Sequence, residues 1–134
     1  NFLKKEDLIN FYQNTIKEFG LESIENSMGY VLSGGQRRKV EIARCLASKP
    51  KLILLDEPFA GIDPLAIEDI KNVLKSLADK GICILITDHN LRETIDICNY
   101  SIVIKDGSIL DKGEKDYLIN SSLIKEEYFG TVFD

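Results

Sequence analysis

Two stretches decide the fold of this chain, Leu32-Ser33-Gly34-Gly35-Gln36 and Leu52-Ile53-Leu54-Leu55-Asp56-Glu57-Pro58. The first predicts a helix that begins after Ser33, because serine caps helices and Gln36 completes a capping box three residues later. The second predicts a buried strand that ends in two carboxylates. Amides at a helix start bind anions, and acids at a strand tip can hold Mg²⁺ and activate water. Together the two stretches indicate a site for nucleotide hydrolysis.

The chain around these stretches alternates strands and helices. Uninterrupted apolar runs at 52–55 and 82–86 predict strands that are buried on both faces, as in parallel sheets covered by helices. Between them, Asp63 as cap, Pro64 at the first position and Gly81 past the end predict a helix. Its inner stripe is expected to be Ile67, Ile70, Leu74 and Leu77. We therefore predict the α/β class, with a βαβ unit of parallel strands and flanking helices.

The flanking segments have weaker signals. Apolar residues at helical spacing, followed by Gly20, predict a first helix whose apolar side is more often core than docking surface. These residues are Leu8, Ile9, Tyr12, Ile16 and Phe19. The helix after Ser33 is expected to continue to Pro50. Asn90, with Glu93 three positions later, is expected to cap a short helix. Asp106-Gly107 predicts a hairpin between strands at 100–104 and 109–110, and two short helices are expected near 117–118 and 123–128.

Composition bounds the function classes. The 134 residues suffice for one modest core, and the net charge of −5 disfavours nucleic acid as the main partner. The basic run Arg37-Arg38-Lys39 is expected to be a solvated helix face. Cys45, Cys83 and Cys98 lack metal-ligand spacing and favour a reducing cytoplasm. Since no apolar run approaches about 18 residues, membrane association is expected to come through a partner.

Each motif has a purely structural alternative. The capping box could be only a helix start, but Gly34 and Gly35 in the first turn each cost helix stability, and they would let a ligand approach bare backbone. The pair Asp56-Glu57 could be an ordinary loop pair, but ligands bind beyond the carboxyl ends of parallel strands. His89, which follows the second predicted strand, is expected beside this pair.

These motifs resemble the nucleotide-binding subunits of ATP-binding cassette (ABC) transporters. Residues 32–36 match the family signature, 52–57 the Walker B strand and 60–63 the D-loop, while His89 matches the switch histidine. Within the family, the phrases at 37–44, 56–64 and 87–94 look most like the ATPase of the lipopolysaccharide export system. The ATPases of branched-chain amino-acid importers share residues 41–44 but less of the phrase after His89, and they are the alternative.

The resemblance implies a mechanism. Two subunits would close head to tail on two ATP molecules, with Ser33, Gly34, Gly35 and Gln36 of one subunit facing the nucleotide held by the other. It implies that Asp56 holds Mg²⁺, Glu57 polarises the attacking water and His89 contacts the γ-phosphate, while Asp63 couples the two sites. It also implies permease partners in the inner membrane and a peripheral position on its cytoplasmic face.

One departure from the family is large. No stretch reads Gly-x-x-x-x-Gly-Lys-Ser/Thr, the Walker A loop that wraps the β- and γ-phosphates. We therefore expect the C-terminal portion of a P-loop NTPase domain, with residues 1–48 as part of the helical subdomain and 49–134 as part of the ATPase core. Alone, it is expected to be inactive in hydrolysis and to associate with itself through strands that lack neighbours.

Two other function classes stay open at this level. The chain could be a non-catalytic module that supplies only the signature face to a partner, although the presence of Asp56, Glu57 and His89 argues against this. It could also be a soluble cassette protein of DNA repair or translation. The acidic balance, and the short spacing between Gln36 and Asp56, disfavour that class.

Overall fold

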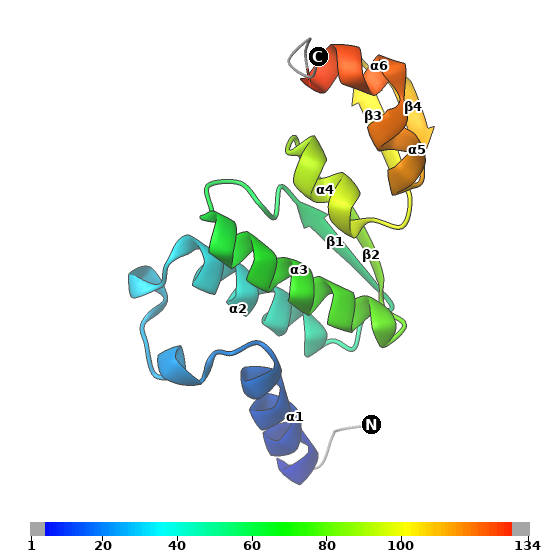
Figure 1. The fold of residues 1–134 in the computed structure, drawn as a ribbon. Helices are drawn as coiled ribbons and strands as arrows, with labels where there is room; N and C mark the ends of the chain where they lie inside the picture. Colours follow the sequence, from blue (N-terminus) through cyan, green and yellow to red (C-terminus); the bar gives the residue numbers. More distant parts are fainter. Residues whose placement is uncertain (1–4, 130–134) are drawn as a thin grey trace.

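The computed structural model describes residues 5–129, apart from the side chain of Phe129. The outer ends of the predicted segments 1–48 and 49–134 lie outside the described residues. The elements, in chain order, are α1 (Lys5–Glu18), η1 (Glu22–Ile24), η2 (Gly29–Val31), α2 (Gly34–Leu46), β1 (Leu52–Asp56), α3 (Pro64–Asp79), β2 (Cys83–Thr87), α4 (Leu91–Ile97), β3 (Ser101–Lys105), β4 (Ser108–Gly113), α5 (Lys115–Asn120), α6 (Ser122–Ile124) and the π-helical turn η3 (Lys125–Phe129) (Figure 1).

Strands β1 and β2 form the parallel pair that the sequence predicts. Leu52 lies opposite Cys83 and Asp56 opposite Thr87, so the carboxyl ends of both strands meet at one edge. Helix α3 connects the strands and lies over the pair, with α2 beside it (Figure 1). The predicted inner stripe of α3 is confirmed, because all four of its residues are buried in the first core cluster, namely Ile67, Ile70, Leu74 and Leu77.

The predicted helix caps are also confirmed. The backbone N–H of Gln36 donates to Ser33 Oγ at 3.3 Å, and the N–H of Ser33 donates to Gln36 Oε1 at 3.0 Å. At the start of α3, the N–H of Ala66 donates to Asp63 Oδ1 at 3.0 Å. Helix α2 ends at Leu46, earlier than expected, because Lys49 takes a left-handed φ of 52° directly before Pro50.

A second core lies toward the C-terminal end. Strands β3 and β4 are antiparallel, and Asp106 and Gly107 both have positive φ, which confirms the predicted hairpin turn. Helices α4, α5 and α6 pack against this hairpin, and their shared buried residues are Ile95, Val103, Leu118 and Ile124. The first core instead contains residues from both sides of position 48, such as Ile42 and Ile53. The predicted division at 48 stays a prediction.

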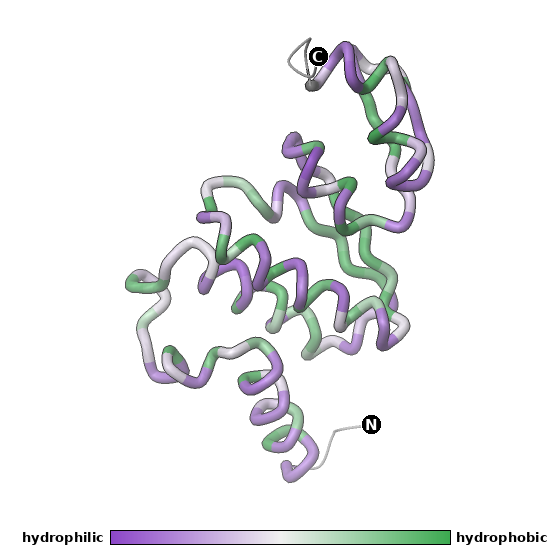
Figure 2. Tube along the Cα trace, viewed as in Figure 1, coloured by the Kyte–Doolittle hydropathy of each residue, from purple (hydrophilic) through white to green (hydrophobic). Residues whose placement is uncertain are grey.

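The expectation that both strand faces are buried is wrong for this chain. Burial alternates along β1 and β2, and the side chains of Leu54 and Leu85 are 68% and 57% exposed. Helices α2 and α3 cover one face, and in the described part of the chain no element covers the other. Figure 2 shows that the strand residues are nevertheless apolar. Uninterrupted apolar strands are typical of a sheet that is covered on both faces. In the described part of this chain, only one face of the β1–β2 pair is covered.

Helix α1 also departs from expectation. It forms where predicted and is followed by Gly20 in a left-handed conformation, but none of its residues is fully buried. Leu8, Ile9 and Tyr12 are about half exposed, because α1 projects away from the α2–α3 layer and is anchored at its C-terminal end by Phe19 (Figure 1). The apolar stripe of α1 is therefore mostly surface rather than core.

Across residues 5–129, the structure contains no helix long and apolar enough to span a bilayer.

Candidate nucleotide site

The sheet edge where β1 and β2 end carries the predicted acids. Asp56 is the last residue of β1, and its Oδ1 accepts a hydrogen bond of 2.6 Å from Thr87 Oγ1 at the end of β2. The parallel register places these two side chains at the same level of the sheet. The sequence alone indicated this edge as the site, because ligands bind beyond the carboxyl ends of parallel strands. The Asp56 carboxylate is exposed and remains able to accept further ligands.

Glu57 and His89 converge beyond this edge. His89 Nδ1 lies 3.4 Å from Glu57 Oε1, and the two side chains are 73% and 56% exposed. The backbone of Glu57 is left-handed, with a φ of 46°, and its N–H donates to Thr87 O at 2.7 Å. The structure therefore brings together three of the predicted site residues, Asp56, Glu57 and His89, in positions that a ligand can reach.

Asp88 is a site residue that the sequence reasoning missed. Its side chain is fully buried, with Oδ2 accepting from the N–H of Phe59 at 3.1 Å and Oδ1 accepting from the N–H of Asn90 at 2.8 Å. The available signal was an acid directly after a strand and two residues before a helix cap, a pattern typical of side chains that bond to nearby backbone. Nothing in that local pattern indicated the contact with Phe59.

The signature residues lie apart from this group. An open cleft of about 440 Å³ is lined by Asp56, Glu57 and His89 together with residues of β2, α4, β3 and Tyr128, whereas residues 33–36 and Asp63 are not among its lining. Ser33 and Gly34 are exposed at the start of α2. Gly35 is buried, and a Cβ built on it would lie 2.5 Å from Ala66 Cβ of α3. Gly35 is thus required for the close packing of two helices.

The basic run at 37–39 is not the solvated face that was expected. Arg38 forms an ion pair of 2.8 Å with Glu41, and its Nη2 donates to the carbonyl of Glu57 at 3.3 Å. Lys39 is mostly buried and lies 3.4 Å from Asp69 of α3. These contacts exist because α2 packs against α3 and against the turn after β1, so two of the three basic residues face protein.

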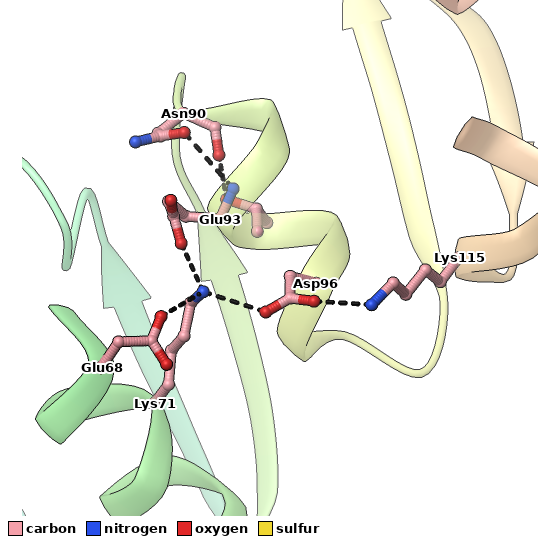
Figure 3. A network of polar contacts seen from close by, with 7 residues as sticks. Glu68, Lys71, Asn90, Glu93, Asp96 and Lys115 are labelled. Carbon is pink, nitrogen blue, oxygen red and sulfur yellow. Dashed lines mark hydrogen bonds and ion pairs between the residues drawn. The ribbon is translucent and has the colours of Figure 1, made fainter. Parts of the chain in front are cut away.

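A buried lysine joins α3 to α4 beside the site. The side chain of Lys71 is 5% exposed, and its Nζ forms ion pairs with Glu68, Glu93 and Asp96 (Figure 3). Asp96 also pairs with Lys115 of α5 at 2.6 Å. Burial opposes the charge on Lys71, but its hydrogen bonds with Glu93, Asp96 and Glu68 outweigh this and raise its pKa. Hydrogen bonds from Lys115 and Lys71 lower the pKa of Asp96 to about 2.

The described residues contain no group of three or more His, Cys, Asp and Glu side chains arranged to hold a metal ion by themselves. A cation at this edge would therefore take only part of its ligands from protein carboxylates and the rest from a bound ligand and water. That donor set fits Mg²⁺, which in nucleotide sites is commonly bound by one or two carboxylates together with phosphates and water.

Comparison with known proteins agrees with this architecture. The family described as ABC transporter (ABC_tran) matches residues 4–60. A solved ATP-binding cassette of an ABC transporter in its ADP conformation superposes with a TM-score of 0.80 at 31% identity, and the match covers 96% of this chain and 52% of that chain. A dimeric cassette in a post-hydrolysis state bound to ADP and Pi superposes with a TM-score of 0.70 at 28% identity, covering 86% of this chain and 50% of that chain.

The fold is therefore that of part of an ABC-type P-loop NTPase domain. Among sequence relatives, the lipopolysaccharide export system ATP-binding protein LptB of Haemophilus influenzae is 47% identical over 118 residues, which are 88% of this chain and 49% of that protein. The chain thus resembles the ATP-binding subunits of ABC transporters, including those of lipopolysaccharide export. It spans about half the length of the relatives that it matches.

Proposed function

We propose that this chain provides the signature, Walker B and switch-histidine part of an ATP-hydrolysing ABC transporter subunit. The observation that carries the proposal is the approach of Glu57 and His89, 3.4 Å apart, beside Asp56 at the carboxyl edge of parallel strands. Phosphoryl transfer to water requires positioned groups and charge stabilisation more than covalent chemistry. Two exposed side chains converging on one edge suit that requirement.

Each cleft residue then has a distinct task. Glu57 is the base that polarises the attacking water, and His89 contacts the γ-phosphate while its Nδ1 faces the Glu57 carboxylate. Asp56, oriented by Thr87, holds Mg²⁺. The ion, when bound, supplies charge stabilisation for the phosphate oxygens.

The signature residues act on a second nucleotide. Because Ser33, Gly34, Gly35 and Gln36 are not among the cleft lining, the exposed start of α2 is free to face the ATP held by a second subunit. The dimeric cassette among the solved relatives, bound to ADP and Pi, supports this assembly. Asp63 couples the two sites, since it caps α3 directly after the turn at Gly61, whose carbonyl oxygen lies near Gly34.

The transported molecule is lipopolysaccharide, and the subunit acts on the cytoplasmic face of the inner membrane with permease partners. The names of relatives such as the Haemophilus influenzae protein support this assignment. Because no stretch of this chain reads Gly-x-x-x-x-Gly-Lys-Ser/Thr, the Walker A loop is assigned to the part of the relatives' length that this chain does not span. By itself the chain therefore hydrolyses no ATP.

The test of hydrolysis uses a complete cassette, made by joining the N-terminal half of the Haemophilus influenzae relative to this chain. Glu57→Gln lowers ATP turnover by roughly 10² to 10⁴ fold, the span of a general base, while Mg-ATP binding persists. Glu22→Gln, an exposed acid outside the cleft, is the matched control and leaves turnover unchanged. Equal steady-state turnover of the Glu57→Gln cassette and the unsubstituted one removes Glu57 from this role.

The transport assignment has a separate test. Haemophilus influenzae depleted of its own LptB should grow when it expresses the active chimeric cassette, and should not grow with the Glu57→Gln form. A cassette that hydrolyses ATP but does not support growth would contradict lipopolysaccharide export and favour another transport system.

A further inference from the structure

Glu57 is held in a backbone conformation that it does not favour. A left-handed φ is unfavourable in a residue other than glycine and persists only where surrounding contacts enforce it. Glu57 has a φ of 46° and is followed by Pro58, which is fully buried. The direction of its carboxylate toward His89 depends on this conformation, so the groups that enforce it also set the geometry of the site.

One enforcing group is Asp88. Its buried carboxylate joins two turns, because one oxygen accepts from Phe59 in the turn that carries Glu57 and the other accepts from Asn90 in the turn that carries His89. Both backbone segments are thus bonded to the same side chain. Asp88 Oδ1 lies 3.9 Å from His89 Nδ1, which is too far for a hydrogen bond.

A second side chain that holds this turn is Arg38, in addition to the backbone bond from the Glu57 N–H to Thr87 O. Its guanidinium reaches from α2 to the carbonyl of Glu57 at 3.3 Å and is itself held by Glu41 at 2.8 Å. The same carbonyl accepts from the N–H of Ala60 at 3.2 Å, which closes the turn. Charged side chains on two elements therefore hold the 57–60 turn, one at a backbone amide and one at a backbone carbonyl.

We infer that Asp88 and Arg38 are positioning residues, which hold the 57–60 turn so that the Glu57 carboxylate faces His89. The inference rests on the proposed function. It also gives α2, whose first turn carries the signature residues, a direct contact with the turn that carries the catalytic carboxylate of its own chain. A shift of α2 would act on Glu57 through Arg38.

The chemistry of Asp88 allows a substitution that removes one hydrogen bond without changing the size of the side chain. An ionised aspartate accepts at both oxygens, whereas asparagine has the same shape but only one acceptor oxygen and an amide that donates. In Asp88→Asn, either Phe59 or Asn90 must lose its acceptor. The side chain volume is kept, so any effect comes from the lost bond rather than from a cavity.

The experiment uses the chimeric cassette with Mg-ATP. Asp88→Asn should lower kcat by about 10 to 100 fold, the effect of a misplacement near 1 Å, with KM and nucleotide affinity changed by less than about threefold. Arg38→Met should act in the same direction, and Arg38→Lys should restore part of kcat because a lysine also donates to a carbonyl. Ile70→Val, a core change that removes one buried methyl group and lowers stability only modestly, should leave kcat unchanged.

The outcomes separate this inference from the proposed function. Loss of turnover in Glu57→Gln with unchanged kcat in Asp88→Asn would overturn the positioning role alone.

If the unsubstituted cassette is inactive, the proposed function is at fault, and the inference is decided by NMR on the chain itself. Asp88→Asn should then remove exchange protection from the Phe59 or Asn90 amide and the proton contact between Glu57 and His89, and retention of that contact would refute it.

Discussion

Gly35 illustrates how one residue can serve a motif and a packing contact together. The sequence interpretation explained both glycines of the signature by ligand approach. In the structure, Gly35 is buried where α2 crosses α3, and Gly34 is exposed. A glycine at the second position of α2 permits the two helix backbones to approach, so its cost in helix propensity is offset by packing as well as by any ligand.

Gly35→Ala should therefore destabilise the fold. The added Cβ would lie 2.5 Å from Ala66 Cβ, which forces α2 and α3 apart and should lower the free energy of unfolding by about 1–3 kcal/mol. Gly34→Ala is the matched control, because a Cβ at position 34 would lie 3.4 Å from its nearest neighbour, Gly61 O, and its effect should be below about 1 kcal/mol. Urea denaturation of the chimeric cassette measures both.

A double-mutant cycle identifies the cause. Ala66→Gly removes the group that the new Cβ would meet, so Gly35→Ala with Ala66→Gly should be more stable than the sum of the two single changes predicts. Strict additivity would contradict the proposed steric origin.

At the scale of elements, the short helix α4 is joined to its neighbours by ion pairs as well as by apolar contacts. Helix α4 buries Ile95 and connects to α3 through Lys71 and to α5 through Asp96 (Figure 3). The predicted capping of α4 by Asn90 is present, but Glu93, expected to help cap it, pairs with Lys71 instead. That exchange of partners depends on α3, which is distant in the sequence, and no local pattern could indicate it.

This network predicts a dependence of stability on pH. The folded pKa of Asp96, about 2, lies below the value of about 3.9 for an unfolded chain. A depressed carboxyl pKa contributes stability that is complete above the unfolded value and is lost as the pH falls through the folded value. The contribution of Asp96 should thus be complete above about pH 5 and decline toward pH 2.

Asp96→Asn isolates this contribution. At pH 6 the variant should have a lower urea midpoint than the unsubstituted cassette, and the gap between them should narrow steadily as the pH is lowered toward 2. Asp7→Asn, an exposed acid on α1, serves as the control and should show no such narrowing. A gap that is independent of pH would mean that the charge of Asp96 is not what stabilises this junction.

At the scale of the whole molecule, the uncovered sheet face is the dominant feature. Leu52, Leu54 and Leu85 expose large apolar side chains on one face of β1 and β2, and the pair is only two strands wide. Exposed apolar strands with free edges favour association. In a cassette of the relatives' full length, we expect the additional residues to cover this face.

The isolated chain should therefore form dimers or larger assemblies at micromolar concentration, as measured by light scattering after size exclusion. Leu54→Lys combined with Leu85→Lys should shift it toward monomer, because both charges fall on the exposed face. Leu65→Lys, which alters a leucine that is 77% exposed on α3, is the control and should leave assembly unchanged. A monodisperse monomer of the unsubstituted chain would refute the prediction.

The sequence by itself determined the elements and the edge at which the candidate site lies. The caps at Ser33 and Asp63, the turn at Asp106-Gly107 and the parallel strands could all be predicted, because each depends on residues within a few positions or on a general rule of α/β topology. Only the tertiary structure decided which apolar residues of α1, β1 and β2 are exposed, why Gly35 lacks a side chain, and that Asp88 and Arg38 hold the turn of Glu57. Those properties depend on contacts between residues that are far apart in the chain. The sequence of a single segment does not show which distant residues it will contact.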